Sequence, residues 1–377
     1  MPFTSLGLSD ALLKALIDQK FTIPTPIQIT AIPAILTRKD VLGIASTGSG
    51  KTASYVLPLL MNLQQGLKVK NRQANVLVLV PTRELAEQVK DVFQIFSRAL
   101  PERIKTLAVY GGVSINPQMM AMQGVNVLVA TPGRLLELVN SNAVDLSGIE
   151  TLVLDEADKL LNLGFKEELD QIISLLPEER QNILLSATLS TELQHIEQIL
   201  LHDPVVIKIE EKEASLDLIN QVAYIVSEEG KGPFLRYLIK HHDMKQVLVF
   251  ASSVGTADAI VNKLRKNNFD AKAIHSKKSQ GARTDALHHF KAGSLRILVA
   301  TDLMARGIDI SDLPFVINYE LPRSPKDYIH RIGRTGRAGS TGEAISLVSQ
   351  NELHHFEVIQ KKMGKQVNLI DGKSITT

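Results

Sequence analysis

The sequence of 377 residues contains no cysteine and no tryptophan. Without cysteine, the chain can form neither disulfides nor thiolate metal sites, and this absence fits a reducing compartment. No apolar run approaches the ~20 residues that a membrane-spanning helix needs. The first residues also lack the basic-then-apolar layout of a signal peptide. We therefore expect a cytoplasmic protein.

Net charge and aromatic content are also low for a nucleic-acid binder. The formal net charge is only +2, and the aromatic residues are 11 phenylalanines and 6 tyrosines. Any basic surface must therefore be local, and recognition of a nucleic-acid backbone is favoured over stacking on bases. Hydrophobic content of 44% and charged content of 22% are typical of a globular protein. The length suggests about two or three domains.

Short runs of valine, isoleucine and leucine alternate with amphipathic, helix-like segments along the chain. This pattern is typical of parallel sheets covered by helices on both faces. The strands predicted in the first half are 41–45, 75–80, 106–110, 125–130, 151–154, 182–186 and 205–209. Those predicted in the second half are 220–225, 246–251, 271–275, 296–300, 315–319 and 342–347. The sequence therefore predicts an α/β protein with two doubly wound parallel-sheet domains.

The charged, non-periodic segment Glu210-Glu211-Lys212-Glu213 marks the boundary between the two series of strands. We predict a first domain at residues 1–209, a linker at 210–217, a second domain at 218–366 and a short tail at 367–377. Residues 245–253 resemble residues 39–47, a strand that runs into a loop of small residues. Either the second domain repeats the first fold without a working phosphate loop, or the two strand starts are unrelated.

Residues 45–52, Ala-Ser-Thr-Gly-Ser-Gly-Lys-Thr, have the setting of a phosphate-binding loop, between a predicted strand and a predicted helix. In such a loop, glycines let successive N–H groups point at phosphate oxygens, and the helix start adds partial positive charge. Lys51 is expected to reach the β- and γ-phosphates and Thr52 to offer its hydroxyl to Mg²⁺. Ala45 replaces the first glycine of the generic pattern, and Pro58 predicts that the following helix kinks or ends there. The expected nucleotide contacts are Ser46, Thr47, Gly48, Ser49, Gly50, Lys51 and Thr52.

Carboxylates follow the predicted strand 151–154 in the run Asp155-Glu156-Ala157-Asp158. In open α/β sheets, ligands bind at the carboxyl ends of the strands. We expect Asp155 to hold Mg²⁺, mainly through water, opposite Thr52, and Glu156 to orient or deprotonate the attacking water. Alone, an Asp-Glu pair after a strand is usually a helix cap. Its combination with the phosphate loop favours the catalytic interpretation.

With these motifs in this order, the chain resembles the DEAD-box RNA helicases, as a bacterial-type minimal core, from about Phe3 to about Leu347. The resemblance implies two tandem RecA-like domains, ATP and Mg²⁺ as cofactors, and RNA as partner. The segment from Phe21 to Gln28 resembles the adenine-reading Q motif. Gln28 would then hydrogen-bond the adenine edge, and Phe21 would stack on the ring. Lys20 stands where the family usually has glycine.

Other segments of the first half resemble the family's RNA-binding and coupling motifs. Each follows a predicted strand, where N–H groups, hydroxyls and guanidinium groups can meet phosphates and 2′-hydroxyls. The implied RNA contacts are Pro81, Thr82, Arg83, Gly111, Gly112, Thr131, Pro132, Gly133 and Arg134. The run Ser186-Ala187-Thr188 resembles the coupling motif, whose hydroxyls would bond to Asp158 and link the nucleotide site to RNA.

The second half carries the matching motifs of the family's second domain. Ser252, Arg283 and Thr301 are implied RNA contacts, although Ser276 replaces a glycine of the family pattern near Arg283. Gly307 and Asp309 are implied contacts of ATP, with Asp309 on the ribose. Residues 330–337 hold three arginines without an acid. The resemblance makes Arg334 and Arg337 fingers for the γ-phosphate, with His330 in a coupling role.

We therefore predict a monomeric, RNA-stimulated ATPase whose catalytic residues are Lys51, Asp155 and Glu156 of the first domain and Arg334 and Arg337 of the second. Closure of the domains on ATP and RNA would locally unwind short RNA duplexes or remodel RNA–protein complexes, with little sequence preference. Two alternatives remain open. One is an ATP-gated RNA clamp that turns over little, and the other is a DNA translocase on the same core.

The Q motif predicts a preference for adenine nucleotides. The protein is expected to use ATP well and GTP poorly, because the Gln28 amide can donate to and accept from the adenine edge, whereas guanine presents the opposite pattern. Gln28→Ala is expected to weaken ATP binding. Steady-state hydrolysis of the two nucleotides measures this preference, and equal use of both would contradict the Q-motif interpretation.

Overall fold

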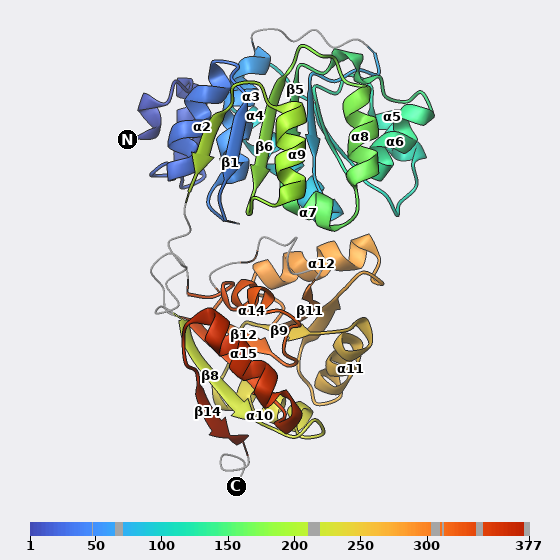
Figure 1. The fold of residues 1–377 in the computed structure, drawn as a ribbon. Helices are drawn as coiled ribbons and strands as arrows, with labels where there is room; N and C mark the ends of the chain where they lie inside the picture. Colours follow the sequence, from blue (N-terminus) through green and yellow to red (C-terminus); the bar gives the residue numbers. More distant parts are fainter. Residues whose placement is uncertain are drawn as a thin grey trace. The chain divides into compact units, whose positions relative to one another are not determined.

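The computed structural model describes residues 1–46, 48–64, 71–209, 219–302, 310, 313–336 and 342–372. The chain divides into two compact units, Met1–Glu211 and Lys212–Thr377. Each unit contains one seven-stranded sheet with helices on both faces (Figure 1). Among the described residues, no helix combines the length and the apolar character required to traverse a lipid bilayer.

In the first unit, all strand pairs are parallel and the strand order is β3-β4-β2-β5-β6-β1-β7. The strands are β1 (Val41–Ile44), β2 (Val76–Leu79), β3 (Thr106–Val109), β4 (Val127–Ala130), β5 (Thr151–Leu154), β6 (Gln181–Ser186) and β7 (Val205–Lys208). The central strands consist of almost uninterrupted apolar residues because both of their faces are buried.

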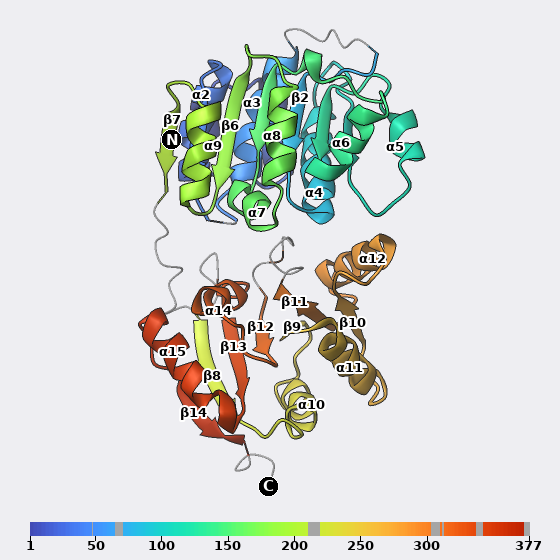
Figure 2. The ribbon, with the colours of Figure 1, turned by 45° about the vertical axis from the view of Figure 1, so that its right-hand side comes forward.

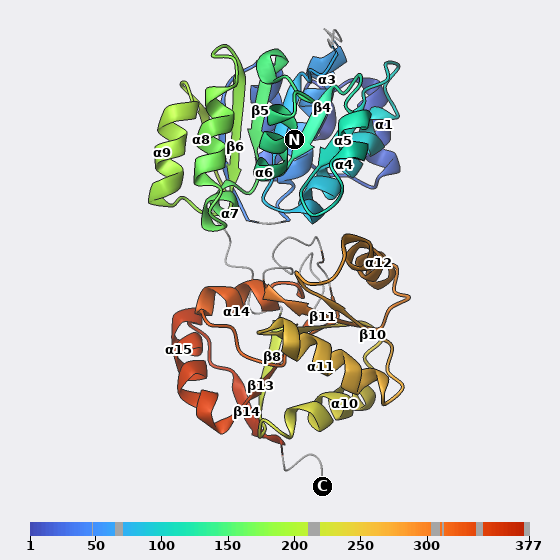
Figure 3. The ribbon, with the colours of Figure 1, turned by 90° about the vertical axis from the view of Figure 1, so that its right-hand side faces the viewer.

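Two hydrophobic clusters cover the two faces of this sheet. One face packs against α1 (Asp10–Asp18), α2 (Pro26–Leu36), α3 (Lys51–Gln64) and α4 (Arg83–Ser97). The other packs against α5 (Asn116–Ala121), α6 (Pro132–Asn140), α7 (Ala157–Asn162), α8 (Lys166–Ser174) and α9 (Thr191–Leu200). Figure 3 shows α8 and α9 on one side of the sheet and α1 and α3 on the other. The layers are those of a doubly wound α/β fold.

The second unit repeats this architecture with the order β10-β11-β9-β12-β13-β8-β14. Its strands are β8 (Ile219–Ile225), β9 (Val247–Ala251), β10 (Ala271–Ile274), β11 (Ile297–Thr301), β12 (Phe315–Asn318), β13 (Gly342–Val348) and β14 (Asn368–Asp371). Its helices are α10 (Lys231–His241), α11 (Val254–Arg265), α12 (Gln280–Lys291), α14 (Pro325–Ile332) and α15 (Leu353–Met363). Helices α10 and α11 cover one face, and α12, α14 and α15 cover the other (Figure 2).

Six of the described α-helices begin at a serine or threonine whose hydroxyl accepts a hydrogen bond from a free backbone N–H group. Thr82 Oγ1, for example, accepts a hydrogen bond of 3.2 Å from Leu85 N at the start of α4. The same kind of cap is formed by Ser9, Ser190, Ser253, Ser279 and Ser324. Apart from Ser9, which precedes the first strand, each capping residue lies in the connection between a strand and the following helix. The structure also contains short 3₁₀ helices at Phe3–Ser5, Leu146–Gly148 and Gln350–Glu352.

Every strand predicted from the sequence is present, with ends that differ by only one or two residues. Two features differ from the predictions. The predicted tail at 367–377 contains a strand, because Asn368–Asp371 form β14 and pair in parallel with β8. Helix α3 continues through Pro58 to Gln64, so of the two predicted outcomes at this proline, a kink or an end, the end is wrong. Burial of Leu57, Leu59 and Leu60 in the core outweighs the hydrogen bond that the proline removes.

The two sheets have the same strand order when strands are counted from the start of each unit. The strand that corresponds to β1 is therefore β8, and β9 corresponds to β2. The sequence similarity of residues 245–253 to residues 39–47 thus does not mark equivalent strands. The equivalent of the phosphate loop is the segment between β8 and α10, in which α10 begins at Lys231 as α3 begins at Lys51.

Lys231 is fully buried, and its ammonium group is paired with carboxylates of the same unit. Lys231 Nζ lies 2.7 Å from Glu352 Oε2 and 2.9 Å from Glu228 Oε1. Glu352 also accepts hydrogen bonds of 2.9 Å from Ser349 N and Ser349 Oγ. The lysine at this helix start is therefore neutralised by the protein itself.

The buried carboxylate of Asp40 ties together the starts of three strands in the first unit. Its oxygens accept hydrogen bonds from Asn182 N (2.7 Å) and His202 N (2.8 Å).

Asp40→Ala is expected to lower the free energy of unfolding by about 2–4 kcal/mol, because it leaves these N–H groups unpaired. Urea denaturation measures the change. Asp170→Ala, on the exposed surface of α8, is the control and should change stability by less than about 0.5 kcal/mol. An equally small effect of Asp40→Ala would contradict the assigned role.

Candidate active site

The predicted motifs of the first unit gather at one edge of its sheet. Because all strands of the sheet are parallel, the segments that follow β1 to β6 lie at the same edge. These segments contain the phosphate loop, the implied RNA motifs, the carboxylate run and the coupling motif, in that order along the chain. Residues that are more than a hundred positions apart thus become neighbours.

The phosphate loop has the backbone geometry that its glycines predict. Gly48 and Gly50 have φ angles of 85° and 91°, in the left-handed region that favours glycine. A Cβ atom on Gly50 would lie 2.5 Å from Gln28 Nε2, so no larger residue fits there. Ala45 donates its N–H to Ser186 O (3.0 Å) as an extension of β1, and alanine is therefore compatible with this position. Thr47 lies outside the described residues.

The Q-motif residues contact the phosphate loop directly. Gln28 is buried; its Nε2 donates to Gly50 O (3.2 Å), and its Oε1 accepts from Thr25 N (2.9 Å). The Phe21 ring is partly exposed and packs edge-on against Phe96, with centroids 5.9 Å apart. Lys20, where the family usually has glycine, has a φ of 62°. This left-handed backbone explains why glycine suits that position.

Lys51 begins α3, and its side chain is only 6% exposed. The nearby carboxylates that act on its charge are those of Asp155, Glu156 and Asp158. Lys51 Nζ donates to Ala45 O at 2.5 Å. Burial lowers the pKa of Lys51, whereas the charges of Asp155, Glu156 and Asp158 raise it. Burial also raises the pKa of Asp155, which is 2% exposed, and the charge of Lys51 opposes that rise. Burial thus disfavours the charged forms of Lys51 and Asp155, and their opposite charges partly offset this effect.

Glu156 is held in an unusual backbone conformation between β5 and α7. Its φ and ψ are 53° and 47°, a left-handed conformation that is strained for residues other than glycine. One oxygen, Oε1, pairs with Lys159 Nζ at 2.7 Å. Burial raises the pKa of Glu156, and the charge of Lys159 lowers it.

The free carboxylate oxygens fit a magnesium–nucleotide site. In the part of the chain that the structure describes, the buried atoms Glu156 Oε2 and Asp158 Oδ1 have no hydrogen-bond partner. Within the same residues, no cluster of three or more histidine, aspartate or glutamate side chains could hold a metal by itself. Mg²⁺ is usually held by one or two carboxylates together with substrate phosphates and water. The donor set beside Lys51 and Thr52 is of this kind.

The coupling motif contacts Asp158 through one of its two hydroxyls. Thr188 Oγ1 donates to Asp158 Oδ2 at 3.0 Å. Ser186 Oγ instead donates to Thr188 O (2.7 Å) and accepts from Thr188 N (3.3 Å). The expected bond from Ser186 to Asp158 is therefore not formed, because this hydroxyl closes the turn after β6.

The implied RNA residues of the first unit lie at the starts of helices and in turns. Arg83 packs so closely on Gly112 that a Cβ atom there would lie 2.1 Å from Arg83 Nη2. Arg134 donates to Val113 O (2.8 Å) and to Glu137 Oε2 (2.7 Å). The remaining members of the set are Pro81 and Thr82 before α4, Gly111 after β3, and Thr131, Pro132 and Gly133 at the start of α6.

The second unit also places its implied residues after strand ends. Ser252 follows β9, and its N and Oγ both donate to Glu320 Oε2, at 2.7 and 2.6 Å. Thr301 ends β11, and Arg283 is buried in α12. His330 lies in α14. Gly307, Asp309 and Arg337 lie outside the described residues.

The arginines of residues 330–337 have different surroundings. Arg331 is bound internally: its guanidinium pairs with both oxygens of Asp302 (2.5 and 2.7 Å) and lies 5.0 Å from the Phe250 ring centroid. Arg334 follows α14, is largely buried, and its Nη1 is 3.5 Å from Ile310 O. Arg331 thus serves the fold of the second unit.

The chain matches two family models, the DEAD/DEAH box helicase model over residues 25–196 and the helicase conserved C-terminal domain over residues 230–339. It is 39% identical over 364 residues to the DEAD-box ATP-dependent RNA helicase CshA of Geobacillus kaustophilus, covering 96% of this chain and 77% of that protein. The chain belongs to the DEAD-box family of ATP-dependent RNA helicases.

Other family members are similar over the same extent. The ATP-dependent rRNA helicase rrp3 of Botryotinia fuckeliana is 40% identical, with 97% of this chain and 74% of that protein covered. The solved structure of S. cerevisiae Dbp5 bound to RNA and ADP BeF3 matches with a TM-score of 0.83 and 28% identity, covering 99% of this chain and 96% of that chain. A DEAD box protein from Methanococcus jannaschii matches with a TM-score of 0.55 and 36% identity, covering 98% and 99%.

Two side chains of the first unit and one of the second contact predicted site residues although the sequence did not predict them. Tyr55 Oη donates to Asp155 Oδ2 at 2.9 Å. Lys159 pairs with Glu156, and Glu320 accepts from Ser252. For Tyr55, a signal was available: it lies four residues after Lys51 on α3 and therefore on the same helix face. The other two pairings depend on side-chain directions after strand ends, which the sequence does not specify.

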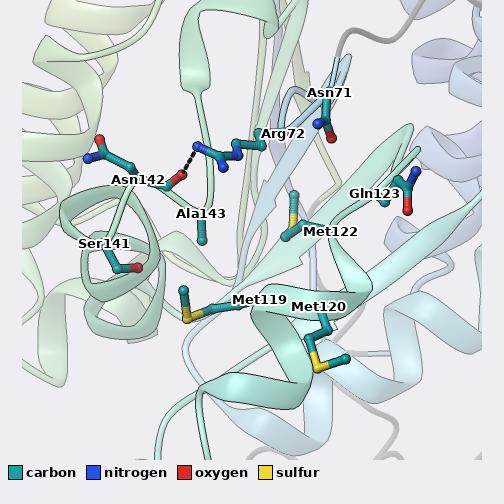
Figure 4. A pocket seen from close by; sticks show the side chains of 9 residues that line it. All are labelled: Asn71, Arg72, Met119, Met120, Met122, Gln123, Ser141, Asn142 and Ala143. Atoms are coloured by element: carbon teal, nitrogen blue, oxygen red, sulfur yellow. Dashed lines mark hydrogen bonds between the residues drawn. The ribbon is translucent and has the colours of Figure 1, made fainter.

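A separate pocket of about 520 Å³ lies at the opposite edge of the first sheet, where β2 and β4 begin (Figure 4). Arg72 Nη1 donates to Asn142 O (3.0 Å) at its rim, and the Met120 side chain is 83% exposed. The pocket contains none of the predicted site residues. Its lining residues are Asn71, Arg72, Met119, Met120, Met122, Gln123, Ser141, Asn142 and Ala143.

Proposed function

We propose that this DEAD-box helicase hydrolyses ATP at the strand-end edge of the first unit, using Lys51, Asp155 and Glu156. The supporting observation is that the buried ammonium group of Lys51 lies among the carboxylates of the segment after β5. Lys51 would bind the β- and γ-phosphates, replacing its present bond to Ala45 O. Gln28 and Phe21 would bind the adenine, and residues 46–52 the phosphates.

The carboxylates have separate roles in this proposal. Thr52 and Asp155 would hold Mg²⁺, Asp155 mainly through water, and the ion would neutralise charge on the phosphates. Glu156 would orient the attacking water and accept its proton. A raised pKa suits a general base that works near neutral pH, and Glu156 has this property through burial. Its free oxygen Oε2 is available for the water.

The second unit would complete the site with arginines. Arg334 and Arg337 would approach the γ-phosphate, while Gly307 and Asp309 would contact the nucleotide. Planar guanidinium groups can bind phosphate oxygens with two hydrogen bonds and are suited to this role. We propose residues 1–209 as the ATP-binding domain, residues 218–366 together with β14 as the C-terminal domain, and the segment between them as linker.

RNA would bind through its backbone, at the residues after β2, β3 and β4 in the first unit and at Ser252, Arg283 and Thr301 in the second. The hydrogen bond from Thr188 to Asp158, with Ser186 and His330, would couple RNA binding to hydrolysis. Contacts to phosphates and 2′-hydroxyls favour RNA over DNA with little sequence preference. The proposed result is local unwinding of short duplexes or remodelling of RNA–protein complexes by a cytoplasmic monomer.

Steady-state ATP turnover tests this activity when it is measured without nucleic acid, with single-stranded RNA, and with DNA of the same sequence. We expect strong stimulation by RNA alone, because 2′-hydroxyl contacts distinguish RNA from DNA. Lys51→Ala should lose at least about 10²-fold in kcat. The matched control is Lys105→Ala, which also removes an ammonium group bonded to backbone carbonyls. A slow, RNA-independent turnover would favour the clamp, and equal stimulation by DNA would favour the translocase.

Arg334→Lys and Arg337→Lys in the full chain test the division of labour between the units. An arginine finger is worth roughly 10³–10⁵ in rate, and lysine lacks its planar fork. Both variants are expected to lose most RNA-stimulated turnover, while ATP affinity falls far less. Arg265→Lys is the control, because Arg265 ends α11 and its guanidinium bonds to the backbone carbonyl of Ala271 in β10. Turnover near the parental level in both finger variants would rule out the split site.

A further inference from the structure

Tyr55 is fully buried in α3, with its hydroxyl directed at the carboxylate proposed to hold Mg²⁺. The ring packs against Phe93 of α4, with centroids 6.3 Å apart. Tyr55 Oη donates to Asp155 Oδ2 at 2.9 Å, and both side chains are almost completely shielded from solvent. The tyrosine therefore connects the core of the first unit to the segment after β5.

The hydroxyl of Tyr55 is also close to the phosphate loop. Tyr55 lies three residues after Thr52 on α3, and residues with this spacing share a helix face. Burial and the charge of Asp155 raise the pKa of Tyr55 well above its ordinary value, and a hydrogen bond with the Thr52 side chain opposes this rise. The phenol thus faces both residues that the proposed function assigns to Mg²⁺.

Packing alone does not require a hydroxyl at this position. Phenylalanine would give the same ring contacts with Phe93, and a buried hydroxyl without a partner would be destabilising. The hydroxyl has an ionisable partner, Asp155, whose orientation it restricts. Groups that hydrogen-bond to metal-binding carboxylates fix their orientation, and their loss typically costs 10–100-fold in metal affinity.

We infer that Tyr55 is a positioning residue, which holds Asp155 in the orientation required for Mg²⁺-dependent nucleotide binding. Because Thr52 and Tyr55 share one helix, the phenol sets the place of Asp155 relative to the phosphate loop. The inference rests on the proposed function, since it assumes that Asp155 and Thr52 serve the magnesium ion.

Tyr55→Phe in the full chain isolates the hydroxyl from the ring. The measurement is equilibrium binding of a fluorescent ADP analogue over a series of Mg²⁺ concentrations and in EDTA. We expect the Mg²⁺ concentration for half-maximal binding to rise by about tenfold or more. Binding in EDTA should be unchanged, because the hydroxyl acts only through Asp155.

Tyr328→Phe is the matched control. Tyr328 is equally buried, and its Oη lies 3.1 Å from Ser346 Oγ in the second unit. This variant loses a hydroxyl of the same kind, away from Asp155, and should keep the parental Mg²⁺ dependence. A rise of the same size in both variants would overturn the inference, since it would reflect general loosening.

A double-mutant cycle with Asp155→Asn separates a positioning role from independent effects. If Tyr55 acts through Asp155, the hydroxyl should add little to the loss already caused by Asp155→Asn. Additive losses would overturn the inference, as would a parental Mg²⁺ dependence in Tyr55→Phe or equal weakening with and without Mg²⁺.

If the parental protein binds the analogue equally in EDTA and in Mg²⁺, the magnesium assignment of the proposed function fails as well. A parental dependence that Tyr55→Phe leaves unchanged refutes only the role of Tyr55.

Discussion

A lysine ammonium buried at the start of a helix requires an anion, because an unpaired charge in a protein interior is strongly destabilising. Both units meet this requirement after their first strand, but in different ways. In the first unit, Lys51 experiences the charges of Asp155, Glu156 and Asp158, and its ammonium group bonds to the backbone carbonyl of Ala45. In the second, Lys231 pairs with Glu228 and Glu352, and Glu352 is itself fixed by Ser349. The same strand order therefore gives one unit whose lysine bonds to a backbone carbonyl beside carboxylates, as the proposed phosphate site requires, and one whose lysine is paired with two glutamates.

The sequence predicts the strands well because both faces of each central strand are buried, so that apolar runs such as Val76–Leu79 are uninterrupted. It fails where tertiary contacts decide. Strand β14 is short and mostly exposed, and only pairing with β8 makes it a strand. Helix α3 keeps its form through Pro58 because its flanking leucines are buried. The sequence similarity between residues 245–253 and 39–47 also does not identify equivalent strands. Strands β1 and β9 have similar residues because both are buried, but they occupy different positions in their sheets.

The candidate site was predictable to the extent that its chemistry is local in the sequence. Glycine spacing indicates the phosphate loop, and acids directly after an apolar strand indicate the carboxylates. Contacts between distant segments could not be predicted in the same way. The bond between Tyr55 and Asp155 joins residues that are a hundred positions apart, and the internal pairing of Arg331 with Asp302 depends on how α14 packs on its sheet. Ser186 closes its own turn, because its hydroxyl bonds to the backbone of Thr188 two residues later.

The contacts of the first unit form a continuous series across separate strand-end segments. Gln28 bonds to Gly50 O, Tyr55 on the following helix bonds to Asp155, and Thr188 bonds to Asp158. Glu156 lies between Asp155 and Asp158 in the sequence, and its left-handed backbone conformation costs about 1–2 kcal/mol. Such a conformation persists only where the surroundings hold it, and here both neighbouring carboxylates are fixed by hydrogen bonds from other segments. Helix α3 therefore connects the phosphate loop to Asp155 through Tyr55, and Thr188 fixes the other end of the strained turn at Asp158. In the proposed function these bonds link the nucleotide motifs of the first unit to its coupling motif, and His330 adds the contribution of the second unit.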